Sequence, residues 1–126
     1  MIHLSKKRIT LSIIANQIGG QTRARYIASA CLIFMQHLQD EQTKSEIYHL
    51  SDFLNVSWAE FAFEIFARSS RSVSTISITT AQYPVVAKRP HNSRIDCSSN
   101  KNVFGIEQLH RREGSKVISR ELEVTL

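Results

Sequence analysis

Residues 9–22 read Ile9-Thr-Leu-Ser-Ile-Ile-Ala-Asn-Gln-Ile-Gly-Gly-Gln-Thr22 and set the pattern of the fold. The first seven side chains are mostly β-branched or apolar, and they predict a buried strand over residues 9–15. The paired glycines predict a tight turn or a close approach between backbone segments. Residues 23–39 predict a helix with one buried stripe, because apolar side chains recur there at helical spacing. The stripe consists of Ala24, Ile27, Ala28, Cys31, Phe34, Met35 and Leu38.

A second helix is predicted to begin after residue 57. Ser57-Trp-Ala-Glu60 is a capping box, in which the serine caps the first turn and the glutamate reaches back to the serine backbone. We expect this helix to end near Ser69. Its apolar side chains share one face, which is typical of a core rather than of a base-stacking platform. They are Trp58, Phe61, Ala62, Ile65 and Phe66.

The remaining elements are short. Residues 81–92 contain both prolines of the chain and are predicted to be extended and irregular. Strands alternate with helices, which favours an α/β fold, and so few short strands are typical of part of a larger sheet. The other predicted elements are strands over residues 46–50, 74–80 and 93–96, a brief helix capped by Ser98, and a terminal helix over residues 112–123.

Length and composition predict one domain over residues 1–126. No apolar run approaches the roughly 20 residues of a membrane-spanning helix. The basic residues 6–8 follow apolar residues, whereas a signal peptide has the reverse order. Two widely spaced cysteines, Cys31 and Cys97, fit buried thiols in a reducing compartment. We therefore expect a cytoplasmic protein without a membrane segment.

The formal net charge of +5 favours anionic partners such as nucleotides, phosphates or nucleic acid, although such a charge also serves solubility. A small basic nucleic-acid-binding domain remains an alternative, but no helix-turn-helix, RNA-recognition or zinc-finger pattern supports it. The five histidines lack metal-ligand spacing. Lys88-Arg89-Pro90 is the more informative basic site, because proline stiffens the loop and Arg89 offers a planar fork suited to a diphosphate.

Four stretches occur together in a fixed order. The most specific is Ala81-Gln-Tyr-Pro-Val-Val-Ala-Lys-Arg-Pro-His-Asn-Ser-Arg-Ile-Asp96, followed in specificity by Leu11-Ser-Ile-Ile-Ala-Asn-Gln-Ile-Gly-Gly-Gln-Thr22. The others are Ile47-Tyr-His-Leu50, which precedes the helix opening with Ser57-Trp-Ala-Glu-Phe-Ala62, and Phe104-Gly-Ile106. Over essentially its whole length the chain resembles the C-terminal half of the dTDP-4-dehydrorhamnose reductases, a family of extended short-chain dehydrogenases/reductases.

The resemblance implies an α/β substrate-binding part, with few short strands and flanking helices and with the Rossmann half largely missing. In the family, NADPH or NADH reduces the C4 ketone of dTDP-4-dehydro-L-rhamnose to give dTDP-L-rhamnose for surface polysaccharide such as O-antigen. The catalytic Tyr-x-x-x-Lys pair and the Gly-rich cofactor loop are absent from this chain, and Tyr83 precedes Lys88 by five positions. We therefore expect a fragment that does not reduce the ketone alone, and turnover of NADPH by the purified chain would contradict this.

The resemblance also implies a set of substrate-binding residues. The first loop would face the substrate cleft, and the second group would lie on the opposite wall, with Arg89 contacting the diphosphate. Turn geometry and helix capping explain Gly19 and Thr22 equally well. The six residues are Gln17, Gly19, Thr22, Arg89, Asn92 and Ser93.

Several positions depart from the family pattern. Asn16 stands where the family has aspartate, Gln21 where it has proline, and residues 108–112 lack the usual tryptophan. Some members bind magnesium at a dimer contact through glutamates, and the matching position here is Arg25, which would repel the metal. The implied partners are a dTDP-linked deoxy-sugar and either a second copy or a separately encoded Rossmann half. In the latter case the chain would be a nucleotide-sugar-binding module without catalysis. Unpaired strand edges predict poor solubility or association.

Overall fold

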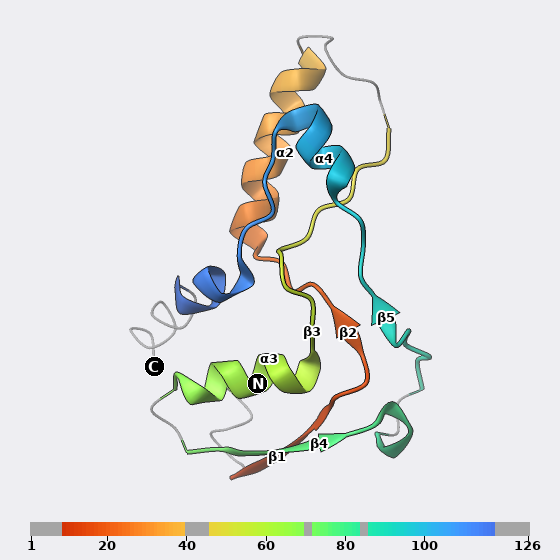
Figure 1. Cartoon of the computed structure of the whole chain (residues 1–126), viewed down its shortest axis with the longest axis vertical. Coiled ribbons are helices and arrows are strands. Elements are labelled where there is room, and N and C mark those ends of the chain that lie inside the picture. Colours follow the sequence, from red (N-terminus) through yellow and green to blue (C-terminus); the bar gives the residue numbers. More distant parts are fainter. Residues whose placement is uncertain (1–8, 40–45, 70–71, 84–85, 118–126) are drawn as a thin grey trace.

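The computed structural model describes residues 9–39, 46–69, 72–83 and 86–117. Strands and helices alternate along it, which confirms the α/β fold class (Figure 1). Residues 111–117 are also helical. The named elements are β1 (Thr10–Ile14), β2 (Ile18–Gly19), α2 (Ala24–Gln39), β3 (Val56–Ser57), α3 (Trp58–Ala67), β4 (Ser74–Ile78), the 3₁₀ turn η1 (Thr80–Gln82), β5 (Asn92–Ser93) and α4 (Ser98–Phe104).

β1 and β4 form a parallel two-stranded sheet, in which Leu11 lies beside Thr75 and Ile13 beside Ser77. Side chains alternate across a strand, so Leu11 and Ile13 point to the same face, and both are buried there. α3 covers that face, and its Ala62 and Phe66 complete the core cluster. The strands predicted over residues 9–15 and 74–80 are therefore confirmed, with slightly shorter bounds.

The capping box at the start of α3 is confirmed. The Ser57 N–H donates to Glu60 Oε2 at 2.7 Å, and the Glu60 N–H donates to Ser57 Oγ at 3.1 Å. The Ser57 hydroxyl also donates to Glu60 Oε2, at 2.9 Å. The hydrogen bonds from the Ser57 N–H and hydroxyl favour the ionised carboxylate, so they lower the pKa of Glu60. The prediction that Trp58 lies in the core is wrong, because the residue is 44% exposed. Small residues on the inner face, Ala59 and Ala62, let the helix lie close to the sheet and leave the indole at the margin.

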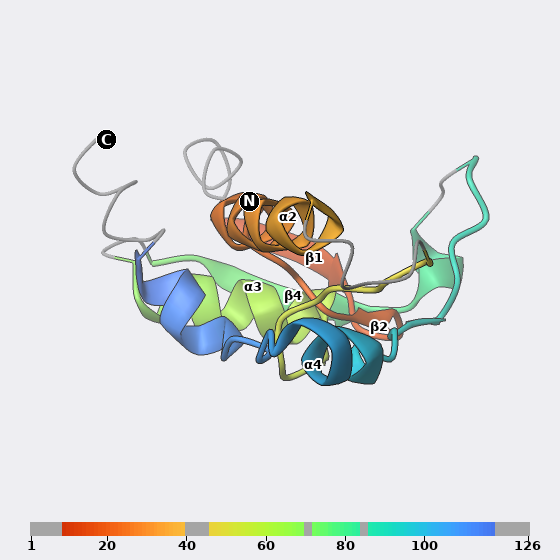
Figure 2. The same cartoon turned by 90° about the horizontal axis from the view of Figure 1, so that it is seen from above.

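The helix predicted over residues 23–39 is confirmed as α2, but most of its predicted buried stripe is exposed. The face that packs against α4 carries Tyr26 and Ala30, which join a second cluster with Phe104 and Ile106. In Figure 2 α2 lies above α4. Among the described residues, only the face of α2 that carries Tyr26 and Ala30 is covered by another element. Phe34 packs at its margin, whereas the rest of the stripe is exposed: Ala24, Ile27, Ala28, Cys31, Met35 and Leu38.

The two cysteines differ in burial. Cys97 is buried as expected, whereas the prediction of a buried Cys31 is wrong because α2 turns it outward. Among the described residues, no helix combines the length and the apolar character that crossing a bilayer requires.

The second sheet has the order β3-β2-β5, with β2 antiparallel to β3 and parallel to β5. The strand predicted over residues 46–50 is wrong. Residues 46–50 are not part of a strand in the structure, and Tyr48 and Leu50 pack against the second cluster. The strand predicted over residues 93–96 is only β5, which starts one residue earlier and ends at Ser93.

The brief helix predicted at Ser98 is confirmed as α4, but Ser98 is not its cap. The Asp96 carboxylate accepts hydrogen bonds from the Ser98 N–H at 2.9 Å and from the Ser98 hydroxyl at 3.0 Å. These hydrogen bonds lower the pKa of Asp96. The terminal helix begins at residue 111, one residue earlier than predicted, and its predicted continuation over residues 118–123 lies outside the described residues.

Candidate functional site

The first loop is tied to the segment after β4 through the hydroxyl of Thr80. Asn16 Oδ1 accepts a hydrogen bond from the Thr80 N–H at 2.9 Å and another from the Thr80 hydroxyl at 2.8 Å. Gln17 Nε2 donates to Thr80 Oγ1 at 3.1 Å. Gln17 is only 5% exposed, so its amide faces the protein rather than a ligand.

The next two residues of the loop pair with the segment that enters β5. The Ile18 N–H donates to the His91 carbonyl at 2.8 Å, and the Ser93 hydroxyl donates to the Ile18 carbonyl at 3.2 Å. A Cβ atom at Gly19 would overlap the Ser93 hydroxyl, so a larger residue there would displace that hydroxyl from its hydrogen bond to the Ile18 carbonyl. The close backbone approach predicted from the paired glycines is thus confirmed.

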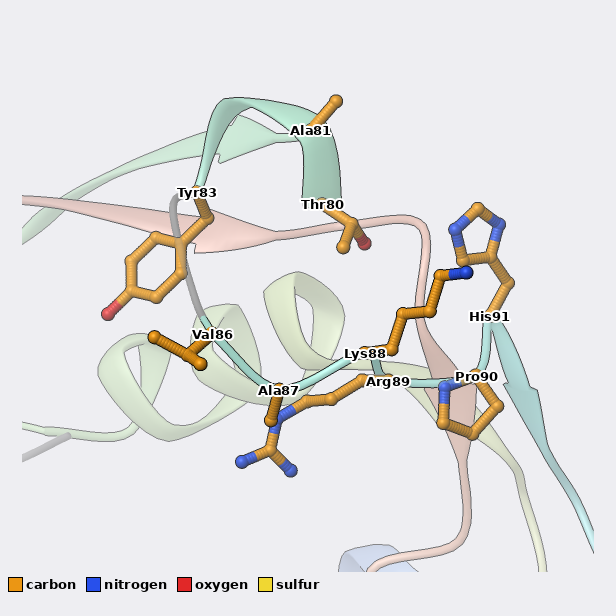
Figure 3. Close-up of a pocket in the computed structure, with 9 residues that line it drawn as sticks. All are labelled: Thr80, Ala81, Tyr83, Val86, Ala87, Lys88, Arg89, Pro90 and His91. Carbon is orange, nitrogen blue, oxygen red and sulfur yellow. The ribbon is translucent and has the colours of Figure 1, made fainter.

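Between these two attachments the chain forms a basic hollow of about 700 Å³ that is open to solvent. Figure 3 shows the Lys88 ammonium extending toward His91, while the Arg89 guanidinium extends in the other direction past Ala87. Figure 2 shows the chain before β5 projecting from the rest of the molecule. Three of the described lining residues, Lys88, Arg89 and His91, are basic, and none is acidic. The full lining consists of Thr80, Ala81, Tyr83, Val86, Ala87, Lys88, Arg89, Pro90 and His91.

The hollow contains one of the six residues predicted to bind substrate, Arg89. Asn92 and Ser93 lie beside Ile18 and Gly19 in one sheet, so the opposite-wall arrangement is wrong for this pair. Asn92 Oδ1 accepts hydrogen bonds from the Arg94 N–H at 3.1 Å and from Arg94 Nε at 2.9 Å.

Thr22 lies elsewhere, where its hydroxyl oxygen accepts from the Asp52 N–H at 3.3 Å. Sequence reasoning did not assign Thr80, Lys88 or His91 to the site. The signal for Lys88 was available in the Lys88-Arg89-Pro90 run, whereas the role of Thr80 depends on contacts between residues 64 positions apart.

A second hollow, of about 440 Å³, lies between α3 and the β1–β4 sheet. Its polar side chains are the hydroxyls of Ser57, Thr75 and Ser77 and the carboxylate of Glu60, which already accepts from Ser57. A carboxylate without a facing cation repels phosphates, so this hollow does not suit a nucleotide.

The glycine pair does not fit a dinucleotide phosphate. Gly19 is closed off by Ser93, and a Cβ at Gly20 would lie 3.1 Å from Asn55 Oδ1 and from the Ser51 side chain. Within the part of the chain that the structure describes, no group of three His, Cys, Asp or Glu side chains could hold a metal ion. Arg25, at the position implied for a magnesium ligand, is exposed on the first turn of α2.

Comparison with known proteins gives a consistent result. The family model described as RmlD substrate binding domain matches residues 1–124. The dTDP-4-dehydrorhamnose reductase of Aggregatibacter actinomycetemcomitans is 39% identical over 114 residues, which are 85% of this chain and 39% of that protein. The reductase of Sinorhizobium fredii is 30% identical and covers 92% of this chain and 41% of its own length.

Solved structures agree with this fold. The dTDP-4-dehydrorhamnose reductase of Bacillus anthracis in complex with NADP has a TM-score of 0.77 at 26% identity and covers 95% of this chain and 41% of its own. That of Clostridium acetobutylicum has a TM-score of 0.79 at 24% identity, with 96% and 41% covered. The chain thus spans about two fifths of the length of these relatives. It belongs to the RmlD substrate binding domain family.

Proposed function

We propose that this chain binds the dTDP-linked deoxy-sugar of a dTDP-4-dehydrorhamnose reductase and holds the diphosphate of that ligand against Lys88 and Arg89. The basic hollow beside Thr80 is the observation that carries the proposal. Lys88 and Arg89 are both exposed in the hollow, and cations attract the negative charges of a diphosphate. The names of the relatives support the same ligand.

In this proposal the chain binds and orients the nucleotide-sugar. The hydride donor and the proton donor for the reduction are not assigned to this chain. Ketone reduction needs a hydride donor and a proton donor aligned at one carbon. NADP, present in the Bacillus anthracis relative, supplies hydride chemistry when bound. Tyr83 and Lys88 line the same hollow, but Figure 3 shows the Tyr83 hydroxyl and the Lys88 ammonium pointing to different sides. They do not form a proton-donating pair in this arrangement.

Replacing Arg89 with alanine is expected to weaken dTDP binding by about ten- to a hundredfold, because a hydrogen bond to a charged group contributes roughly 1.5–3 kcal/mol. Isothermal titration calorimetry of dTDP into the purified protein measures the change, and Lys88→Ala is expected to act in the same direction. Lys101→Ala is the matched control, since Lys101 is an exposed cation that pairs with Glu107 and does not line the hollow. Unchanged affinity in both hollow variants would remove this segment from the site.

A further inference from the structure

We propose that Thr80 is a positioning residue that fixes the place of Lys88 and Arg89 through its hydrogen bonds to Asn16 and Gln17. The inference rests on the proposed function, because it concerns the same ligand site. It assigns to the first loop a task other than contact with substrate. Asn16 and Gln17 would act on the ligand only indirectly, by holding in place the segment between Thr80 and Ser93 that carries Lys88 and Arg89.

The contacts of Thr80 support this assignment. Its hydroxyl donates to Asn16 Oδ1 and accepts from Gln17 Nε2, while its backbone N–H donates to the same Asn16 oxygen. The Thr80 hydroxyl thus donates its one proton and accepts with one lone pair, which fixes the Thr80 rotamer. The hydrogen bond from the Thr80 N–H to Asn16 fixes the backbone at the same point. Valine has the shape of threonine but cannot make either side-chain bond.

The other end of the segment is held by the same stretch of chain. Ile18 pairs with His91 through its backbone, and Gly19 packs against Ser93. Residues 16–19 therefore hold the segment at Thr80 and again at His91–Ser93, and Lys88 and Arg89 lie between these two points. Fixing both ends of a loop limits the positions that its middle can reach.

Burial separates the holding residues from the ligand-facing ones. Gln17 is buried, whereas Lys88 and Arg89 are exposed. A buried amide that loses its acceptor keeps the cost of desolvation without compensation. Removing the Thr80 hydroxyl therefore favours states in which residues 16–17 separate from Thr80, so that Lys88 and Arg89 no longer hold defined positions.

The test compares Thr80→Val with Thr80→Ser, which keeps the hydroxyl. In calorimetry, Thr80→Val is expected to bind dTDP about ten- to a hundredfold more weakly, as when one charged hydrogen bond is lost, and Thr80→Ser is expected to bind like the wild type. A second readout is limited trypsin digestion followed by mass spectrometry. Trypsin cuts poorly before proline, so cleavage in the segment reports on the bond after Lys88. The exposed Lys116 provides the reference site within the same molecule.

Thr80→Val is expected to raise the ratio of cleavage after Lys88 to cleavage after Lys116 several-fold, with the ratio of Thr80→Ser unchanged. An unchanged ratio, or unchanged dTDP affinity in a wild type that binds, overturns the inference. Equal acceleration at both sites overturns it as well, because the hydroxyl would then stabilise the whole fold. If the wild type does not bind dTDP, the proposed function fails, and the cleavage ratio alone decides whether Thr80 positions the segment.

Discussion

Replacing Glu64 with alanine is expected to lower the free energy of unfolding by about 3–5 kcal/mol, because it leaves a buried guanidinium without its counter-ion. Arg111 is only 2% exposed, and its two terminal nitrogens donate to the Glu64 carboxylate at 2.9 and 3.0 Å. Arg112 adds a third hydrogen bond at 3.2 Å. The Arg111 guanidinium also lies 5.6 Å from the centre of the Phe61 ring. Glu64 therefore joins α3 to the helix over residues 111–117.

The same pair predicts acid sensitivity. Burial raises the pKa of Glu64, but the hydrogen bonds and charges of Arg111 and Arg112 outweigh burial and lower it overall. A lowered native pKa stabilises the fold above the unfolded pKa, and this contribution is lost as the pH falls through the native value. Urea unfolding at pH 7 and pH 3 measures it, with Glu113→Ala as the control because the Glu113–Lys116 pair is exposed. Equal loss of stability in both variants at pH 7 would contradict the argument.

Asp52→Asn is expected to stabilise the protein by roughly 1–3 kcal/mol at pH 8, because the ionised carboxylate is buried without a hydrogen bond. Asp52 is 1% exposed, and neither carboxylate oxygen has a hydrogen-bond partner among the described residues. Arg23 Nε approaches to 3.9 Å, which is too long for a hydrogen bond. Asparagine keeps the shape and removes the charge.

The pH dependence of this gain has the opposite sign to that of Glu64. Burial raises the pKa of Asp52, and the lowering effects of Arg23 and Arg111 do not cancel it. The folded wild type therefore takes up a proton before the unfolded chain does, and becomes more stable relative to the variant as the pH falls. Thermal unfolding from pH 8 to pH 4 checks that the advantage of Asp52→Asn shrinks on acidification. Asp96→Asn is the control, since Asp96 is exposed and its pKa is lowered; a constant advantage at every pH would exclude the explanation.

Local signals predicted the fold best. The capping box at Ser57 and the apolar run of β1 act over a few residues, so their structure follows from nearby chemistry. The buried face of α2 could not be predicted in the same way. Periodicity identifies an apolar stripe, but which stripe is covered depends on where α4 lies. The segment over residues 46–50 has strand-like composition, yet a strand also requires a partner with free backbone groups.

The candidate site shows the same division. Arg89 was identified from its basic, proline-bounded loop, and the structure places it in the hollow. Gln17 was assigned to the cleft by resemblance, but its hydrogen bond to Thr80 crosses 63 positions of sequence and turns it inward. The family resemblance thus identified the two segments that form the candidate site. The role of each side chain depends on contacts between distant residues, which a local sequence pattern does not predict.

Residues 16–19 hold the segment between Thr80 and Ser93 at both of its ends, so the residues that support this segment differ from those that line the hollow. Since the pairing of Ile18 and Gly19 with β5 and the hydrogen bonds at Thr80 are independent of the side chains between them, those intervening positions are free to diverge without disturbing the sheets. Substitutions at positions 86–90 would then change the lining of the basic hollow while leaving the pairing of β2 with β5 in place.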